Sequence, residues 1–395
     1  MFVELILALL AGIIIGTLTG LFPGIHINLV GAFLVTLSSS VLIHLPPVYF
    51  VVFITALAIT HTFVDFIPSI FLGCPDTDTE LSVLPGHEML KKGEGYEATM
   101  RTAYGGISSI FLLIILAFPL SYILSKIYFH IQTAIPFILI GICIIMVLSE
   151  KKKISALIVL ALTGILGTCV LNLNLKEPLL PLLSGLFGSS MLFISINQNT
   201  KIPPQNLIFK KIKNLMKPLS GALIASPLCG FLPGLGGGQA AVIGNQISKT
   251  NEKDFLILLG AVNVFVMGLS FVSLYSISRT RTGAAASIQA LIGTMDYKIL
   301  ILILIVCLFS GIISFFLVKI LSIKFLKIFV KINYKKLSIA TIIFLFILIL
   351  LISGFLGIFV FIASTLTGIY CISLNVKKTQ MMGCLLIPTI ILYLF

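Results

Sequence analysis

Two ionisable residues, His61 and Asp65, stand four positions apart within a long apolar segment of this chain. On a helix this spacing puts both side chains on one face. If the segment crosses a membrane, the carboxylate is costly to bury and marks a candidate site for ion binding or coupling. Asn263 lies at a similar depth in a second apolar segment and offers an amide to a cation or a substrate. These three residues are candidates for ion coupling, with a structural hydrogen-bonded pair as the alternative for His61 and Asp65.

Two arginines, Arg279 and Arg281, form a basic loop together with Thr282 between two apolar segments. A guanidinium group suits a carboxylate or a phosphate, which it can hold through two hydrogen bonds. We therefore assign these residues to substrate binding, unless the arginines pair with Asp296 or with lipid head groups. The corresponding loop of the other half, residues 73–80 (GCPDTDTE), is acidic. It is either part of a binding site or a solvated cytoplasmic turn.

Two matching motifs interrupt apolar runs: residues 20–24 (GLFPG) and residues 230–234 (GFLPG). A Pro-Gly pair breaks a helix, because Pro lacks an N–H and Gly readily adopts positive φ. The half-helix that follows presents free N–H groups and a positive dipole end, which favour an anion. The predicted substrate-binding residues at the two breaks are Pro23, Gly24, His26, Asn28, Pro233, Gly234, Gly236, Gly237 and Gln239. The alternative is that the glycines only permit tight helix packing.

Small residues recur at every fourth position around each break. They are Gly12, Gly16, Gly20 and Gly24 in the first copy, and Ala222, Ser226, Gly230, Gly234 and Gly238 in the second. Such a stripe lets a neighbouring helix backbone approach closely in lipid. A helix broken at membrane depth must have its backbone groups satisfied by protein or by a water-filled cavity. Two breaks at matching positions of two halves therefore indicate the binding site of a transporter.

The composition places these segments in a membrane. With 58% hydrophobic and 10% charged residues and a mean hydropathy of +1.18, the chain is not a soluble globular protein of ordinary composition. Apolar windows of about twenty residues, long enough to cross a hydrocarbon core of ~30 Å, predict about ten to twelve membrane segments. We therefore predict an all-α polytopic protein of the cell membrane.

The net charge of +13 comes from lysines that cluster between apolar segments, which indicates topology signals and not nucleic-acid binding. The clusters occupy residues 151–153, 201–217, 319–336 and 377–378. If they face the cytoplasm, the segments of the two halves follow in the same order and in opposite senses. We therefore expect two inverted repeats with re-entrant helix hairpins, as in many secondary transporters. A chance match of the two motifs is the alternative.

The same threading predicts where the chain divides. The first repeat spans residues 1–196, a basic cytoplasmic linker spans residues 197–217, and residues 218–395 hold the second repeat and C-terminal scaffold helices. The individual segments include residues 103–124, 133–148, 179–196, 340–352, 355–374 and 380–395. The loop that carries Lys91, Lys92 and Arg101 is expected on the cytoplasmic side.

No pattern of enzyme chemistry occurs in the sequence. His87 and Glu88 are not followed by the second histidine of a zinc protease motif. Neither a nucleophile-elbow serine motif nor the phosphate-binding lysine motif of an ATPase is present. Seven cysteines are scattered without a C-x-x-C pair, so we expect no disulfide framework, metal site or redox centre. The prediction is a protein that is not an enzyme and has no cofactor, apart from a coupling Na⁺ or H⁺.

The chain resembles the large membrane subunit of tripartite tricarboxylate transporters, the TctA family, in an archaeal-type branch. The resemblance rests on residues 16–24 (GTLTGLFPG), 69–95 (SIFLGCPDTDTELSVLPGHEMLKKGEG) and 230–238 (GFLPGLGGG), and it extends over most of the chain. Pro75-Asp76 and Arg279-Thr280 stand where the family has Pro-Gly pairs, so the resemblance implies the fold and not the substrate. It also implies two partners, a small membrane subunit and an extracellular binding protein.

These observations favour an ion-coupled secondary transporter of a small organic anion, such as a di- or tricarboxylate, with alternating access to a site between the two hairpins. In this hypothesis the arginine loop compensates the charge of the ligand, and Asp65 with nearby polar groups binds the coupling ion. One alternative is a translocase of an anionic lipid such as a polyprenyl phosphate, with the hairpins open sideways to the bilayer. An intramembrane enzyme or a scaffold without transport is a third hypothesis.

Overall fold

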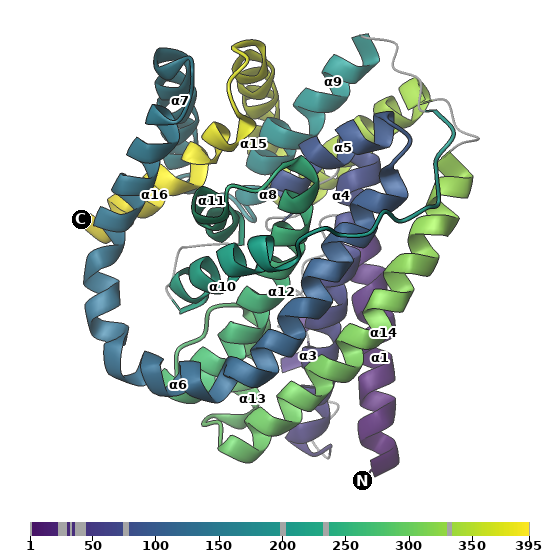
Figure 1. Cartoon of the computed structure of the whole chain (residues 1–395), viewed down its shortest axis with the longest axis vertical. Coiled ribbons are helices and arrows are strands. Elements are labelled where there is room, and N and C mark those ends of the chain that lie inside the picture. Colours follow the sequence, from purple (N-terminus) through teal and green to yellow (C-terminus); the bar gives the residue numbers. More distant parts are fainter. Residues whose placement is uncertain are drawn as a thin grey trace.

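The computed structural model describes residues 2–22, 30–31, 34–35, 45–73, 79–197, 203–231, 237–329 and 334–394. Every regular element in these ranges is a helix (Figure 1). Seven of the described helices are long and apolar enough to cross a membrane, and four shorter apolar helices accompany them. The all-α polytopic fold predicted from the sequence is therefore confirmed.

Four long helices form the centre of the molecule. They are α3 (Pro47–Val64), α6 (Gly95–Leu148), α12 (Glu252–Ile277) and α14 (Tyr297–Phe329). Helices α6 and α12 run in the same direction, because Arg101 meets Asp254 near their starts and the ring of Phe118 lies edge-on to that of Tyr275 further along both.

Helices α3 and α14 form the equivalent parallel pair. Val52 and Val306 belong to one apolar cluster, and Ser314 donates a hydrogen bond to the hydroxyl of Thr60 about two turns further along both helices. The two parallel pairs therefore join the first half of the chain to the second half twice.

The two pairs are packed in opposite directions. Tyr104 of α6 lies edge-on to Phe315 of α14, while Ile110, further along α6, packs on Gly311, which comes earlier in α14. Helices α6 and α14 are thus antiparallel, and so are α3 and α12. Since α3 matches α12 in the order of the two halves, these are the directions that the predicted inverted topology requires.

Helix α1 (Phe2–Leu21) lies along α3 through the stripe of small residues. A Cβ atom built at Gly12 would lie 2.5 Å from the carbonyl oxygen of Phe53, and one built at Gly16 would lie 2.6 Å from that of Leu57. A Cβ at Gly20 would overlap α3 in the same way. Since such distances are shorter than van der Waals contact, glycine is required, and the predicted close approach is confirmed for these three positions.

The second half contains the hairpin of α10 (Met216–Phe231) and α11 (Gly237–Ser248). Gly221 near the start of α10 faces Gly244 near the end of α11. A Cβ atom built at Gly221 would lie 2.6 Å from the carbonyl oxygen of Gly244. The two helices are therefore antiparallel, and both pack on α12. The described parts of α1 and α10 extend to Leu21 and Phe231, two residues before Pro23 and Pro233.

Short helices follow the central ones at both ends of the molecule. After Asp65 the chain forms α4 (Phe66–Leu72), η1 (Glu80–Ser82) and α5 (Val83–Lys91), which lead into α6. In the second half α13 (Gly283–Ile292) connects α12 to α14. Figure 1 shows α5 and α13 at opposite ends of the central helices, consistent with the inverted order.

Helix α6 differs from the prediction of two separate segments at residues 103–124 and 133–148. It is one helix of 54 residues with Pro119 and Pro136 inside it. Each proline removes a backbone N–H and favours a bend, and Figure 1 shows a first leg that descends and a second leg that rises again. The two predicted segments are thus the legs of one curved helix, because backbone hydrogen bonding continues through the turn.

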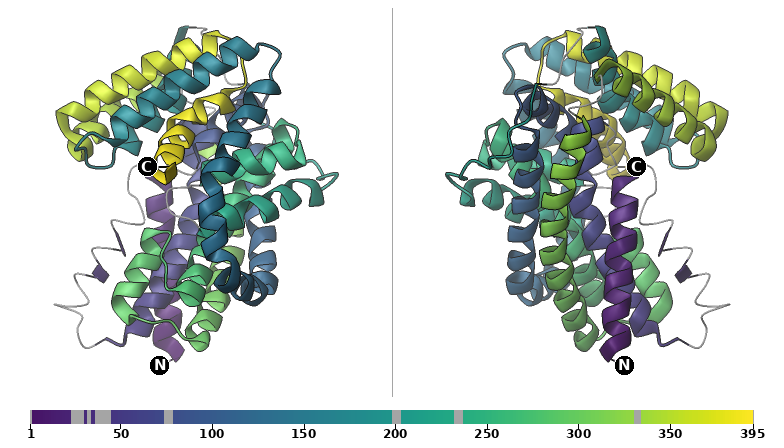
Figure 2. Two further views of the ribbon diagram at one scale, coloured as in Figure 1. Left: turned by 90° about the vertical axis from the view of Figure 1, so that its left-hand side faces the viewer. Right: turned by 90° about the vertical axis from the view of Figure 1, so that its right-hand side faces the viewer.

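The remaining helices gather at the upper end of the bundle (Figure 2). They are α7 (Lys153–Leu171), α8 (Leu179–Leu183), the π-helical stretch η2 (Ser184–Ser189), α9 (Ser190–Asn197), α15 (Tyr334–Ser373), η3 (Lys378–Met382) and α16 (Gly383–Leu394). Gly354 interrupts α15 with a φ of 71°, and Leu345 and Ile358 on its two sides join one apolar cluster. The predicted division between residues 340–352 and 355–374 is therefore confirmed.

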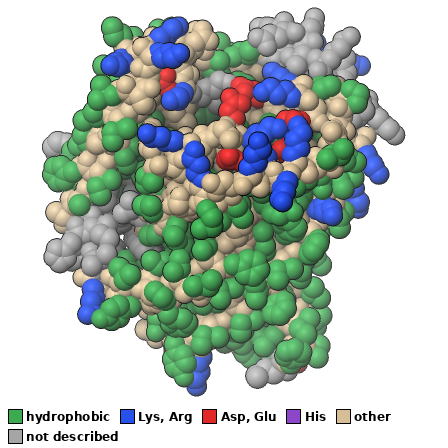
Figure 3. All heavy atoms as spheres, viewed as in Figure 1, with side chains coloured by type: hydrophobic (Ala, Val, Ile, Leu, Met, Phe, Trp, Pro, Cys, Tyr) green, Lys and Arg blue, Asp and Glu red, His purple; other side chains and the backbone are tan. Residues whose placement is uncertain are grey.

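Basic side chains collect at the same upper end, whereas the surface below is mainly hydrophobic (Figure 3). Lys210 of the segment between the halves pairs with Glu94, and Lys377 pairs with Glu150 beside the cluster at residues 151–153. Clusters far apart in the sequence thus share one end, as expected if that end faces the cytoplasm.

The contact between α1 and α3 gives a stability prediction. Gly16→Ala should destabilise the protein by about 1–3 kcal/mol, because the added methyl group meets the α3 backbone and forces the helices apart. Gly141→Ala in α6 is the matched control, since nothing lies within 4 Å of the Cβ position there; it should leave stability unchanged or slightly higher. Unfolding of both purified variants in detergent tests this, and equal midpoints would contradict it.

Candidate functional site

The candidate site is built around a hydrogen bond between α3 and α12. The side-chain amide of Asn263 donates to Oδ2 of Asp65 at 3.2 Å and to the carbonyl oxygen of Thr62 at 3.3 Å. Asp65 is 5% exposed and Asn263 is 4% exposed. Two of the residues assigned to ion coupling, which are 198 positions apart, are therefore brought together, one from each half of the chain.

Asp65 lies at the junction of two helices. It ends α3 and precedes α4, and its own backbone N–H still bonds to the carbonyl oxygen of His61. The carboxylate consequently projects from an almost continuous helix deep within the protein. Such a group is costly to hold in a low-dielectric interior without polar partners, so the amide of Asn263 contributes directly to its stability there.

His61, the third residue assigned to ion coupling, is buried one turn before Asp65 and contacts α1. Its Nδ1 atom lies 3.0 Å from the hydroxyl of Thr19. That hydroxyl donates to the carbonyl oxygen of Gly16 at 3.2 Å, so its oxygen is left to accept a hydrogen bond from Nδ1–H. Thr19 stands two residues before the end of α1, and this contact therefore links the first helix break to the buried site.

A pair of hydroxyl groups lies one turn beyond Asp65. The side chains of Ser69 on α4 and Thr79 before η1 hydrogen-bond at 2.5 Å, and both residues are fully buried. The other half contains a counterpart, in which Ser270 of α12 and Thr282 before α13 hydrogen-bond at 2.8 Å. The two repeats thus fix the loop after their central helix in the same way.

Thr282, assigned to substrate binding, is the N-cap of α13. Its hydroxyl accepts a hydrogen bond from the N–H of Ala285, and its own N–H donates to Ser270. In the same loop Arg279 is exposed and Arg281 is half-buried. Sixteen residues separate Asn263 from Arg279, roughly 24 Å along a helix. The arginines therefore lie at the lower end of α12, and the structure does not bring them to Asp65.

Most residues of the two predicted breaks fall outside the described part of the chain. These are Pro23, Gly24, His26, Asn28, Pro233, Gly234 and Gly236. Gly237 and Gln239 are described and lie buried in the first turn of α11. Gly31, from the second arm of the first hairpin, packs on Ser287 of α13.

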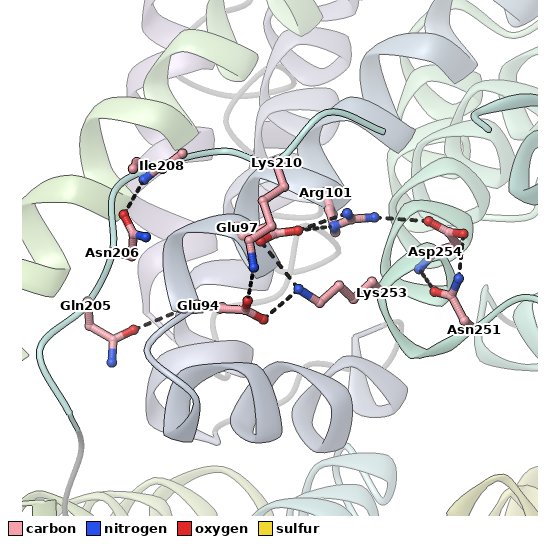
Figure 4. Close-up of polar contacts among 11 residues, drawn as sticks. Glu94, Glu97, Arg101, Gln205, Asn206, Ile208, Lys210, Asn251, Lys253 and Asp254 are labelled. Carbon is pink, nitrogen blue, oxygen red and sulfur yellow. Dashed lines mark hydrogen bonds and ion pairs between the residues drawn. The ribbon is translucent and has the colours of Figure 1, made fainter. Parts of the chain in front are cut away.

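A network of ion pairs lies at the starts of α6 and α12 (Figure 4). Arg101 bonds to Glu97 at 2.8 Å and to Asp254 at 3.0 Å. Lys253 bonds to Glu94 at 2.6 Å and lies 3.5 Å from Glu97. We call the six residues Glu94, Glu97, Arg101, Lys210, Lys253 and Asp254 the ion-pair cluster. It ties the starts of α6 and α12 to each other.

The segment between the two halves is fastened to the ion-pair cluster. Lys210 bonds to Glu94, and Gln205 accepts a hydrogen bond from the N–H of Gly95 (Figure 4). Phe209 stacks on Tyr104 of α6 with ring centroids 4.7 Å apart. The hydrogen bonds that Lys210 and Lys253 donate to the carboxylate lower the pKa of Glu94 below its ordinary value.

Sequence reasoning missed several of these groups. Thr19, Ser69 and Thr79 carry no charge, and hydroxyl residues are common in apolar helices. The spacing of His61, Asp65 and Ser69 at steps of four residues was the available signal for Ser69. The pairing of Arg101 with Asp254 could not be found from spacing, because the two residues are 153 positions apart. In the described residues no group of three or more His, Cys, Asp or Glu side chains is arranged to hold a metal ion.

Comparisons with known proteins give one consistent result. The model of the family described as "Tripartite tricarboxylate transporter TctA family" matches residues 6–383. An uncharacterized protein of Methanocaldococcus jannaschii is 31% identical over 402 residues, covering 98% of this chain and 99% of the relative. No solved structure matches the chain significantly.

The ion-pair cluster gives a second stability prediction. Arg101→Ala should cost about 3–5 kcal/mol, because it leaves Glu97 buried without its main partner. Arg101 and Glu97 side chains are only 7% and 1% exposed. Lys377→Ala, which removes an exposed lysine whose Nζ lies 3.8 Å from Glu150, should cost less than about 1 kcal/mol. Chemical unfolding in detergent measures both, and similar small losses would contradict the importance of the cluster.

The lowered pKa of Glu94 predicts how the contribution of its ion pairs to the stability of the protein depends on pH. The stabilisation is complete above the ordinary carboxyl pKa near 4.5 and is lost as the pH falls through the lowered pKa of Glu94. Glu94→Gln should therefore melt at a lower temperature than the wild type at neutral pH. The difference between the two melting temperatures should become smaller as the pH is lowered. A difference in melting temperature that stays constant with pH would exclude a stabilising role of the Glu94 carboxylate.

Proposed function

Because the chain belongs to the tripartite tricarboxylate transporter TctA family, we propose that it is an ion-coupled transporter of a small organic anion of the di- or tricarboxylate class. The family is a transporter family and not an enzyme family. The chain is accordingly a multi-pass membrane protein with a role in transport. The substrate class, the coupling ion and the residues that bind them are the proposed part.

The observation that carries the proposal is the buried contact between Asp65 and Asn263. An intramembrane carboxylate that faces another helix of the bundle is a typical ion or proton site. Here the partner amide comes from the opposite repeat, so a change in the relative position of α3 and α12 would alter the site. Binding of a coupling ion at Asp65 would thus bias the conformation of the two halves.

The anion is proposed to bind between the two hairpins. The first turn of α11 contributes Gly237 and Gln239, which are buried near the second break. Backbone N–H groups at the start of a helix, together with the helix dipole, favour negative charge. Pro23, Gly24, His26 and Asn28 would supply the first hairpin, and Pro233, Gly234 and Gly236 the second. The inverted arrangement would then cradle the ligand from both sides.

Arg279 and Arg281 are proposed to attract the anion at the lower, external mouth. Their distance from Asn263 along α12 makes this a better role than contact with a centrally bound ligand. Thr282 would serve mainly to hold the loop through Ser270 and the cap of α13. A basic mouth raises the local concentration of an anionic substrate.

Two partners are also proposed, on the basis of the family. A tripartite system would pair this subunit with a small membrane subunit and with an extracellular binding protein that delivers the anion. The position of the arginines at the end opposite the lysine-rich face suits delivery from outside.

The proposal predicts how Asp65 and Asn263, the central pair, affect transport. In proteoliposomes, Asp65→Asn should abolish citrate or succinate uptake driven by a pH or Na⁺ gradient. Asn263→Ala should raise the half-saturating concentration of the coupling ion roughly tenfold or more, since a hydrogen bond to a charged group contributes about 1.5–3 kcal/mol.

Asp296→Asn is the matched control for Asp65→Asn. Asp296 caps the start of α14 through the N–H of Ile299 and is exposed, so this variant should transport as the wild type does. Wild-type vesicles, with the accessory subunits present, that take up no carboxylate under either gradient would count against the proposed function. Full activity of Asp65→Asn would remove Asp65 from the mechanism.

A further inference from the structure

We propose that the coupling ion is a proton and that it reaches Asp65 from the cytoplasmic end through His87, Thr79 and Ser69. This inference rests on the proposed function only in that it calls the proton the coupling ion. The exchange of a proton at the Asp65 carboxyl group does not depend on the substrate. The path consists of described residues that lie between the central pair and the lysine-rich end.

The first step of the path follows the face of α3 and α4. His61, Asp65, Ser69 and Gly73 succeed one another at intervals of four residues, so they lie in a row on one helix face. Neighbours in such a row have Cβ atoms about 5–6 Å apart, a separation that a hydrogen bond or one bridging water can span. The row therefore leads from the buried centre toward the end of α4.

The second step crosses from α4 to the chain before η1. Ser69 donates a hydrogen bond to the backbone carbonyl oxygen of Asp65 at 3.0 Å, so the hydroxyl of Thr79 donates the 2.5 Å hydrogen bond to Ser69. A hydroxyl can accept one proton while it releases another, so this pair is suited to relay a proton. Ser82 donates to the carbonyl oxygen of Thr79 at 2.7 Å, which holds Thr79 in place against Ser69.

The third step is the imidazole of His87. It is 1% exposed, and its Nε2 atom lies 2.7 Å from where a Cβ of Gly73 would stand. Gly73 ends α4 with a φ of 69°, so glycine both permits this backbone conformation and leaves the space for the ring. Histidine is the side chain whose ordinary pKa lies closest to physiological pH, which makes it a suitable acceptor at the cytoplasmic side.

The proton balance of the transfer is simple. A proton binds one nitrogen of His87, and the other nitrogen releases its proton to the Thr79 and Ser69 hydroxyls. The Ser69 hydroxyl first rotates away from the backbone carbonyl oxygen of Asp65. It then passes a proton on to the carboxylate, directly or through one bridging water, and Asp65 becomes neutral. Rotation of the hydroxyls and exchange of the imidazole tautomer restore the path. No oxidant or reductant takes part.

The charged groups around His87 do not block this route. Helix α5 packs on α4, α6, α12, η1 and η2. Glu97, Arg101, Lys253 and Asp254 on α6 and α12 belong to the ion-pair cluster, in which three acidic and three basic residues balance. Among the described side chains near His87, further charged groups include Asp65 on the path and Glu88 and Lys91 of α5 itself.

The opposite side of the central pair lacks an equivalent route in the described residues. The hydroxyl pair there, Ser270 and Thr282, leads to the loop of Arg279 and Arg281. An arginine does not release its proton in proteins. The two halves thus share the hydroxyl pair, and the residue beyond it decides whether protons or anions are favoured.

The test follows the protonation of Asp65 without any substrate. The full-length protein in nanodiscs receives a light-triggered pH jump, and infrared spectroscopy records the carbonyl stretch of a protonated carboxyl group, assigned by its absence in Asp65→Asn. His87→Gln should slow the appearance of this band by about a hundredfold, since a positioned proton donor contributes 10²–10⁴-fold in rate. His130→Gln, a histidine change in the curved part of α6, should leave the rate unchanged.

A second pair of variants separates proton relay from structure. Thr79→Val removes the hydroxyl with little change in shape and should slow the band as His87→Gln does, whereas Thr79→Ser keeps the hydroxyl and should preserve the rate. The inference is overturned if Thr79→Val and His87→Gln both react at the wild-type rate, or if the Asp65 band does not change with pH.

The same samples distinguish failure of this inference from failure of the proposed function. Uptake of citrate driven by Na⁺ alone, together with a band insensitive to pH, would leave the transporter assignment intact and refute the proton path. A band that behaves as expected, in vesicles that take up no carboxylate, would support the path and refute the substrate proposal.

Discussion

The interior of this protein must satisfy its polar groups without help from lipid, and the bond between Asp65 and Asn263 is where that constraint is most demanding. The two helices that carry these residues are the most deeply buried of the long apolar helices in the described chain. A carboxylate in such a place is stable only with a donor close by. Because Asn263, a donor to Asp65, comes from the other half of the chain, this bond links the packing of α3 to that of α12.

Close helix contact is what makes this pairing possible. Glycines of α1 allow α3 to approach within backbone contact, and Gly105 of α6 and Gly260 of α12 do the same for the other pair, where a Cβ at either would lie 2.0 Å from a carbonyl oxygen. In lipid there is little hydrophobic force to hold helices together, so dense packing of small residues takes its place. The small residues therefore position the polar ones.

The two ends of the bundle differ in charge although their architecture matches. Both repeats place a serine and a threonine in a hydrogen bond after the central helix. Beyond this pair, one repeat continues to His87 and the ion-pair cluster, and the other to two arginines. An inverted repeat thus provides the same scaffold on both faces of a membrane, and a few substitutions give each face its own chemistry.

Much of this was determined by the sequence alone. Hydropathy predicted the all-helical membrane fold, the lysine clusters predicted inverted halves, and the spacing of glycines predicted the contact of α1 with α3, because each depends on local pattern or on the side of the membrane. Only the tertiary structure decided that Asp65 meets Asn263, that Arg101 meets Asp254, that α6 is one curved helix, and that the arginines lie far from the centre. These depend on which distant faces come together, and a pairing across more than 150 residues leaves no local pattern from which it can be predicted.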